Sequence, residues 1–110
     1  MANANAFAAL ADPTRRTVFE RLKDGPRSVR ELADTLPVTR PAVSQHLKVL
    51  KDAGLVIDRA QGRQRVYRID PHGLGQLRAW LDRFWDIALE AFKAEAEREI
   101  DEAKEKDKDA

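Results

Sequence analysis

The sequence contains no cysteine among its 110 residues. This excludes disulfide bonds, thiolate nucleophiles, thiol-based redox sensing and every metal site that requires a thiolate ligand. It also lacks an apolar run of the length that a membrane span needs. The alanine-rich start, Met1 to Ala11, carries no basic residue and ends before Asp12-Pro13, so we interpret it as a helix rather than a signal peptide. These features fit a cytoplasmic protein with one modest core.

Glycine and histidine are scarce as well, with five and two residues respectively. The glycines are spaced as helix ends and turns, and none forms a phosphate-binding loop. The histidines, His46 and His72, stand far apart in the chain, and no nucleophile–base pair accompanies them. We therefore expect no catalytic residues, no metal site and no cofactor, and we interpret the protein as a non-enzyme.

The small net charge of +1 conceals an uneven distribution. Residues 1–70 hold 13 basic and 8 acidic residues, whereas residues 71–110 hold 7 basic and 11 acidic residues. The first part is therefore basic by five charges and the second acidic by four. A basic body of this kind favours an anionic partner.

Helix-start and helix-stop signals divide the basic part into short helices. Asp12-Pro13 predicts a helix that closes at Gly25-Pro26. Ser28 and Glu31 form a capping box for a second helix that runs to about Leu36. Thr39 caps a third helix, which contains Pro41 in its first turn and ends at Gly54.

A β-hairpin and a last helix follow. The runs Leu55-Val56-Ile57 and Val66-Tyr67-Arg68-Ile69 are rich in β-branched and aromatic residues, and Ala60-Gln61-Gly62 between them predicts a turn. Asp70-Pro71 starts the last helix. We predict a mainly α chain with a small hairpin: a winged helix-turn-helix of five helices plus a two-stranded wing. Residues 1–92 form this domain, and residues 93–110 form a charged, partly helical or frayed tail.

In a helix-turn-helix, the second helix enters the major groove of DNA. At 100° per residue, the predicted Thr39–Ala53 helix places Val43, Leu47 and Leu50 on one face. Its opposite face carries basic, amide and hydroxyl side chains and no acid before Asp52, whereas ordinary surface helices mix both signs. Arginines also cluster on the hairpin, where they suit phosphates or the minor groove. We predict DNA contacts from Ser28, Thr39, Arg40, Pro41, Ser44, Gln45, His46, Lys48, Arg59, Arg63 and Arg65.

Five segments resemble arsenic-repressor-type (ArsR family) regulators: Ala11 to Arg16, Ser28 to Ala33, Thr39 to Leu50, Ala53 to Val56, and Gly62 to Pro71. The resemblance covers roughly residues 4–92 and implies a dimeric repressor that binds an operator and is often released by a ligand. Metal-sensing members carry a Cys-x-Cys-type pair before the recognition helix, but Glu31 to Leu36 has no thiol. The chain therefore resembles the thiol-free branch, and we expect no metal sensing.

Apolar side chains cover roughly 200° of the last helix from Pro71 to about Phe92, about twice what packing against one core requires. A second copy of the chain is the expected partner, because two-fold dimers dominate soluble oligomers. A ligand pocket lined by Trp80 and Trp85 is the alternative. The resemblance adds the first helix to the same interface. We predict dimer contacts from Phe7, Leu10, Leu77, Trp80, Leu81, Phe84, Trp85 and Ala88.

Two other functions compete with a regulator of double-stranded DNA. A winged helix used only for protein contacts predicts an apolar or mixed third-helix face, which this sequence does not have. A reader of single-stranded RNA needs an exposed aromatic platform, which is also missing. We therefore expect operator DNA and a second copy of the chain as partners, with no membrane. The family resemblance adds an inducer of unidentified chemistry.

Overall fold

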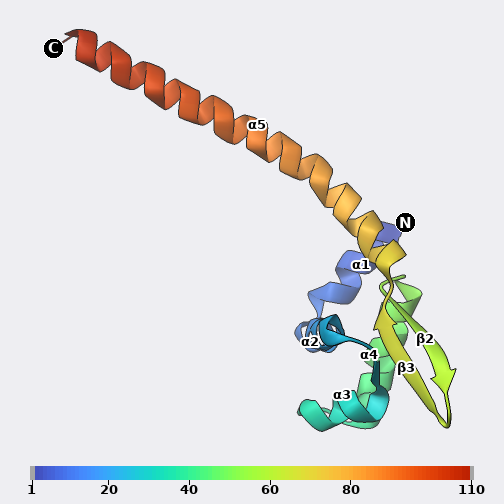
Figure 1. The fold of residues 1–110 in the computed structure, drawn as a ribbon. Coiled ribbons are helices and arrows are strands. Elements are labelled where there is room, and N and C mark those ends of the chain that lie inside the picture. Colours follow the sequence, from blue (N-terminus) through green and yellow to red (C-terminus); the bar gives the residue numbers. More distant parts are fainter. Residues whose placement is uncertain (1, 110) are drawn as a thin grey trace. The chain divides into compact units, whose positions relative to one another are not determined.

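A computed structural model describes residues 2–109, which form two compact units divided between Leu77 and Arg78. Met1 of the predicted first helix and Ala110 of the predicted tail lie outside the described residues. The first unit holds α1 to α4 and a small sheet, and it ends within the first turns of α5 (Figure 1). The second unit consists of the remainder of α5. The predicted domain boundary at residue 92 stays a prediction.

The first two helices meet at Asp12. Helix α1 spans Ala2–Ala11, and α2 spans Pro13–Arg21. The Asp12 carboxylate accepts a hydrogen bond from the backbone N–H of Arg15 at 2.8 Å, which caps α2 as predicted. A 3-10 turn, η1 (Leu22–Asp24), then leads to Gly25, whose φ of 130° favours glycine.

The helix-turn-helix consists of α3 (Val29–Thr35) and α4 (Arg40–Asp52). Ser28 and Glu31 form the predicted capping box at the start of α3: Ser28 Oγ accepts from Glu31 N, and Glu31 Oε1 accepts from Ser28 N. The hydroxyl of Thr39 accepts from Ala42 N and caps α4. The predicted order of helix, short turn and helix is therefore confirmed.

The wing contains one more strand than predicted. Strands β2 (Val56–Gln61) and β3 (Gln64–Ile69) form the expected antiparallel hairpin, and β1 (Arg27–Ser28) pairs with the other edge of β3. The predicted turn at residues 60–62 was placed too early, because Ala60 and Gln61 still pair with β3. Gly62, with a φ of 64°, occupies the true turn.

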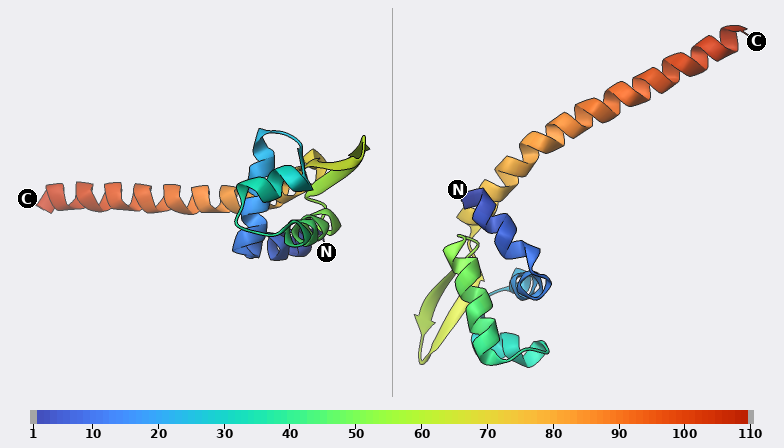
Figure 2. Two further views of the ribbon diagram at one scale, coloured as in Figure 1. Left: turned by 90° about the horizontal axis from the view of Figure 1, so that it is seen from below. Right: turned by 180° about the vertical axis from the view of Figure 1, so that it is seen from behind.

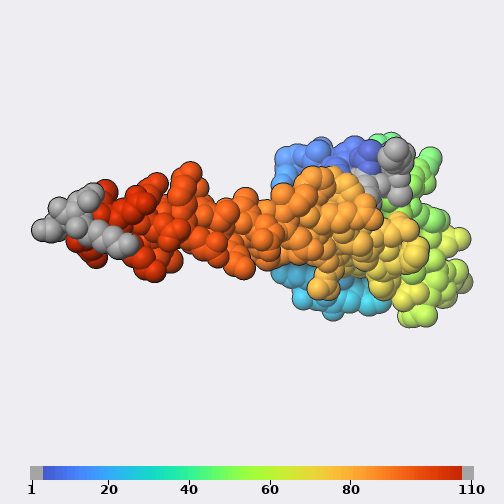
Figure 3. All heavy atoms as spheres, turned by 90° about the horizontal axis from the view of Figure 1, so that it is seen from above, coloured from blue at the N-terminus to red at the C-terminus, as the bar shows by residue number. Residues whose placement is uncertain are grey.

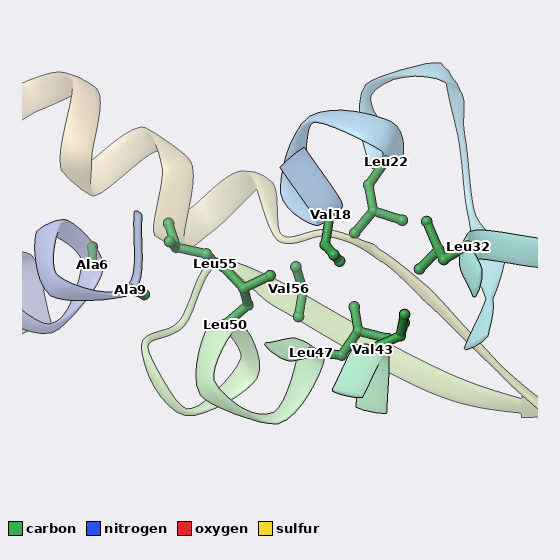
Figure 4. Close-up of a cluster of buried hydrophobic side chains, with 10 residues drawn as sticks. All are labelled: Ala6, Ala9, Val18, Leu22, Leu32, Val43, Leu47, Leu50, Leu55 and Val56. Carbon is green, nitrogen blue, oxygen red and sulfur yellow. The ribbon is translucent and has the colours of Figure 1, made fainter. Parts of the chain in front are cut away.

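The core lies where α1, α2, α3, α4 and β2 meet. Figure 2 shows the arrangement of these elements from two further sides. Figure 4 shows side chains from these elements gathered at one place. Val43, Leu47 and Leu50 of α4 are completely buried there. The core consists of Ala6, Ala9, Val18, Leu22, Leu32, Val43, Leu47, Leu50, Leu55 and Val56.

Helix α5 spans Pro71–Asp109 and so continues through the segment that the sequence predicts to be partly helical or frayed. Asp70 accepts a hydrogen bond from His72 N at its start. Within the first unit, Gly73 lies so close to Gly54 that an added Cβ would be 1.7 Å from the Gly54 carbonyl oxygen. Within residues 78–107, the side chains surround a single helix (Figure 3, orange to red).

Candidate nucleic-acid interface

Helix α4 displays its polar side chains on the surface. Val43, Leu47 and Leu50 are buried in the core, and this fixes the helix so that the opposite face points outward. Thr39 caps the helix, and Pro41 lies exposed in its first turn. The exposed polar residues of this face are Arg40, Ser44, Gln45 and Lys48. The structure thus confirms that these four side chains are accessible, and their contacts with DNA stay predictions.

Two of the predicted contact residues are less accessible than the others. Ser28 is 2% exposed, and its hydroxyl oxygen already accepts the hydrogen bond of the α3 capping box. His46 is half-buried on α4. The backbone hydrogen bond from Arg15 is the largest cause that lowers the pKa of the Asp12 carboxyl, and His46 adds a smaller electrostatic effect. A direct contact of either residue with DNA remains a prediction.

A surface notch brings the start of α3, the start of α4 and the wing together. It has a volume of about 330 Å³. Its lining consists of Ser28, Val29, Arg30, Arg40, Gln64 and Arg65. Three arginines from three separate elements therefore border one space. Guanidinium groups bind phosphate oxygens through charge-assisted hydrogen bonds, so this notch suits a backbone phosphate.

Arg30 is a notch residue that the sequence interpretation missed. It is exposed in the first turn of α3, and its segment is interpreted from the sequence as a capping box and as part of the family resemblance, with no DNA contact predicted for Arg30. Its proximity to Arg40 depends on how α3 packs against α4, which no local pattern shows. The available signal was its position at the start of the first helix of a helix-turn-helix, which crosses the DNA backbone.

The wing arginines are divided between the two faces of the hairpin. Arg59 is paired with Val66, whereas Arg65 is paired with Ala60, so these two arginines project to opposite faces. Arg63 lies in the turn, and all three are exposed. Arg65 differs from the others because its Nη1 lies 3.2 Å from Oδ2 of Asp58. The arginines of the wing can therefore approach an anion from different directions.

The predicted dimer residues fall into two groups. Leu10 and Leu77 are half-buried and pack against the core of the first unit. The others are partly or largely exposed: Phe7 at 40%, Leu81 at 55%, Phe84 at 52% and Trp85 at 61%, together with Ala88, while Trp80 is half-buried. The rings of Trp80 and Phe84 are 4.5 Å apart. None of this tests the dimer contacts, which stay predictions.

The described residues also bear on metals and membranes. Among residues 2–109, no group of three or more histidine, aspartate or glutamate side chains is placed to hold a metal ion. None of the described helices is both long and apolar enough to cross a membrane.

Comparisons with known proteins agree with this geometry. Residues 10–59 match a family model described as a helix-turn-helix domain. The HTH-type transcriptional regulator Rv2034 of Mycobacterium tuberculosis is 62% identical over 87 residues, which cover 79% of this chain and 81% of that protein.

Two solved structures have a similar fold. An ArsR-like transcriptional regulator from Rhodococcus sp. RHA1 is 37% identical, with a TM-score of 0.71, and the match covers 84% of this chain and 90% of that one. A fragment of Mb0332 from Mycobacterium bovis, described as a homodimeric winged helix-turn-helix DNA-binding domain, is 30% identical with a TM-score of 0.64, covering 81% and 82%. With its own helix-turn-helix and wing, the chain belongs to the ArsR family of winged helix-turn-helix transcriptional regulators, which bind DNA.

Proposed function

We propose that the protein is a homodimeric repressor that binds an inverted-repeat operator and reads base edges with α4. One observation carries the proposal. The exposed face of α4 presents Arg40, Gln45 and Lys48 without an acid before Asp52, while the opposite face is locked in the core. Arginine and glutamine have the bidentate geometry that addresses guanine and adenine edges in the major groove.

A two-fold dimer would place two copies of α4 on one side of the duplex. The two helices then reach successive major grooves about 34 Å apart, so the operator is an inverted repeat with that centre-to-centre spacing. The exposed apolar side chains of α5 support this assembly, together with the homodimeric state given for the Mycobacterium bovis fragment. We infer that α5 and α1 form the interface.

The remaining parts of the proposal concern the cellular role. Repression follows the family resemblance, and the promoter of the protein's own gene is the first operator to test. An inducer of unidentified chemistry would release the protein from DNA. Because its ligand is chromosomal DNA, we place the protein in the cytoplasm, and we assign it no enzymatic activity and no cofactor.

The direct experiment is a gel-shift titration on the promoter region of its own gene, with scrambled duplex as competitor. We expect a specific complex that the scrambled duplex does not displace. Arg40→Ala and Gln45→Ala should each cost about 1–3 kcal/mol on the specific site and less on scrambled DNA. Arg83→Ala, which removes the same charge from an exposed position on α5, is the matched control and should change neither affinity.

Two results would contradict the proposal. Equal losses on both duplexes would reassign Arg40 and Gln45 to phosphate contact. No preference of the wild type for any promoter fragment over scrambled DNA, extended to duplexes selected from a random library, would remove sequence-specific binding altogether.

A further inference from the structure

The hairpin contains one acidic side chain, Asp58 on β2, within a strongly basic region. Its side chain is only 7% exposed, and each of its two oxygens pairs with a different cation. Oδ1 lies 2.8 Å from Nζ of Lys51, and Oδ2 lies 3.2 Å from Nη1 of Arg65. A carboxylate in a surface that binds phosphates would repel them, so its presence needs a structural reason.

The two partners of Asp58 come from different elements. Lys51 is in the last turn of α4, and Arg65 is on β3. Asp58 is opposite Tyr67 in the hairpin register, and Arg65 is two residues from Tyr67, on the same face. This is the diagonal cross-strand arrangement that long side chains can span. Asp58 therefore connects the end of α4 to the wing.

The carboxylate is held in its charged form. The hydrogen bond from Lys51 is the largest cause that lowers the pKa of Asp58, and the charges of Lys51 and Arg65 lower it further, against the opposing effect of burial. The link between α4 and the wing is therefore an ionic one at neutral pH.

The position of Arg65 matters because it also borders the notch with Arg30 and Arg40. Its side chain is 60% exposed, and a guanidinium has five N–H donors. The contact with Asp58 thus leaves donors for an anion in the notch. Without the carboxylate, a long and rotamer-rich side chain would have to be ordered when DNA binds, which weakens binding.

We propose that Asp58, held in place by Lys51 at the end of α4, is a positioning residue for DNA binding that orients Arg65 at the notch. This inference rests on the proposed DNA binding. Asp58 has the same sign of charge as the DNA phosphates, yet we expect that removing its negative charge weakens DNA binding. A carboxylate that acted only by repelling phosphates would have the opposite effect.

The test is a double-mutant cycle in DNA affinity with Asp58→Asn and Arg65→Ala. Asparagine keeps the shape of the side chain and removes its charge. We expect Asp58→Asn alone to weaken operator binding about three- to tenfold, and to change it less than about twofold in the Arg65→Ala background. A purely structural role would give the same loss in both backgrounds. Asp58→Glu restores the charge and should recover part of the affinity.

A folding control accompanies the cycle. Thermal melting shows whether each variant is folded, and if Asp58→Asn is not, Asp58→Ser, which also removes the charge, takes its place in the cycle. Tighter binding by Asp58→Asn, or additive losses in the cycle, would overturn the inference. If the wild type shows no preference for operator over scrambled DNA, the proposed function fails; if it does and Asp58→Asn binds equally well, only the inference about Asp58 fails.

Discussion

Helices α4 and α5 are both amphipathic, but their apolar side chains differ in how far they are buried. On α4, Val43, Leu47 and Leu50 are completely buried in the core of the first unit. On α5, Leu81, Ile87 and Phe92 remain 55%, 65% and 73% exposed in the single chain. The apolar face of α4 is covered by its own domain, whereas the apolar face of α5 remains exposed in the single chain.

This difference indicates that the two helices have different roles. A helix fixed by a dry core presents its polar face in one orientation, which is what recognition of base edges requires. An apolar arc that remains exposed is costly in water and is typical of surfaces that bind another protein. We therefore assign DNA reading to α4 and subunit pairing to α5.

The largest effect is expected from a charge in the proposed dimer interface. Leu81→Glu or Phe84→Glu would bury an unpaired carboxylate in each subunit, at a cost of several kcal/mol. The dimer should dissociate, and operator affinity should fall roughly 100-fold or more, because each monomer retains only half of the contacts. Light scattering and DNA titration measure the two effects, and circular dichroism shows whether the monomer is still folded.

Ile100→Glu supplies the matched control for that experiment. Ile100 is 55% exposed, as Leu81 is, but lies on α5 beyond the residues predicted to form the interface. The same change of side chain there should leave the dimer and its DNA affinity intact. If Ile100→Glu dissociates the dimer while Leu81→Glu does not, the interface has been placed on the wrong part of the helix.

An intermediate effect on stability is expected at the start of α5, where the helix is packed rather than exposed. A Cβ at position 73 would collide with the backbone of Gly54, so Gly73→Ala should lower the free energy of unfolding by about 1–3 kcal/mol. At Gly75 an added Cβ meets nothing within 4 Å, so Gly75→Ala should instead stabilise the helix by up to about 1 kcal/mol. Urea denaturation measures the free energy of unfolding of both variants. The same change in both would show that the close approach of Gly73 to Gly54 is absent in solution.

The smallest effect concerns the wing. Arg63 lies in the hairpin turn, and neither the sequence nor the structure assigns a base to it, so we expect it to contact a phosphate. Arg63→Ala should weaken binding to operator and to scrambled DNA alike, and it should flatten the slope of log affinity against log salt by about 0.9. Titrations at several salt concentrations measure this slope. A slope equal to that of the wild type would place Arg63 outside the interface.

Much of the fold could be predicted because its signals are local. The Asp12, Ser28 and Thr39 caps each act within three residues of the helix that they start, and the structure contains all three hydrogen-bonded caps. The face of α4 that would be buried follows from helical periodicity alone. These features need no knowledge of distant parts of the chain.

The features that sequence analysis missed depend on long-range packing. Strand β1 has two residues and exists because β3 offers an edge to it. Arg30 joins the notch through the packing of α3 on α4, and Asp58 reaches Lys51 only when the wing folds back beside that helix. No spacing rule connects these residues, because their separation in the sequence is set by intervening elements.

The assignment of reading to α4 and pairing to α5 is tested most directly by the stoichiometry of the protein alone and on DNA. Multi-angle light scattering should give a dimer at micromolar concentration, and two chains per duplex on an operator selected from a random library. A wild-type protein that is monomeric at this concentration, yet binds the operator tightly and specifically as one chain, would contradict the account.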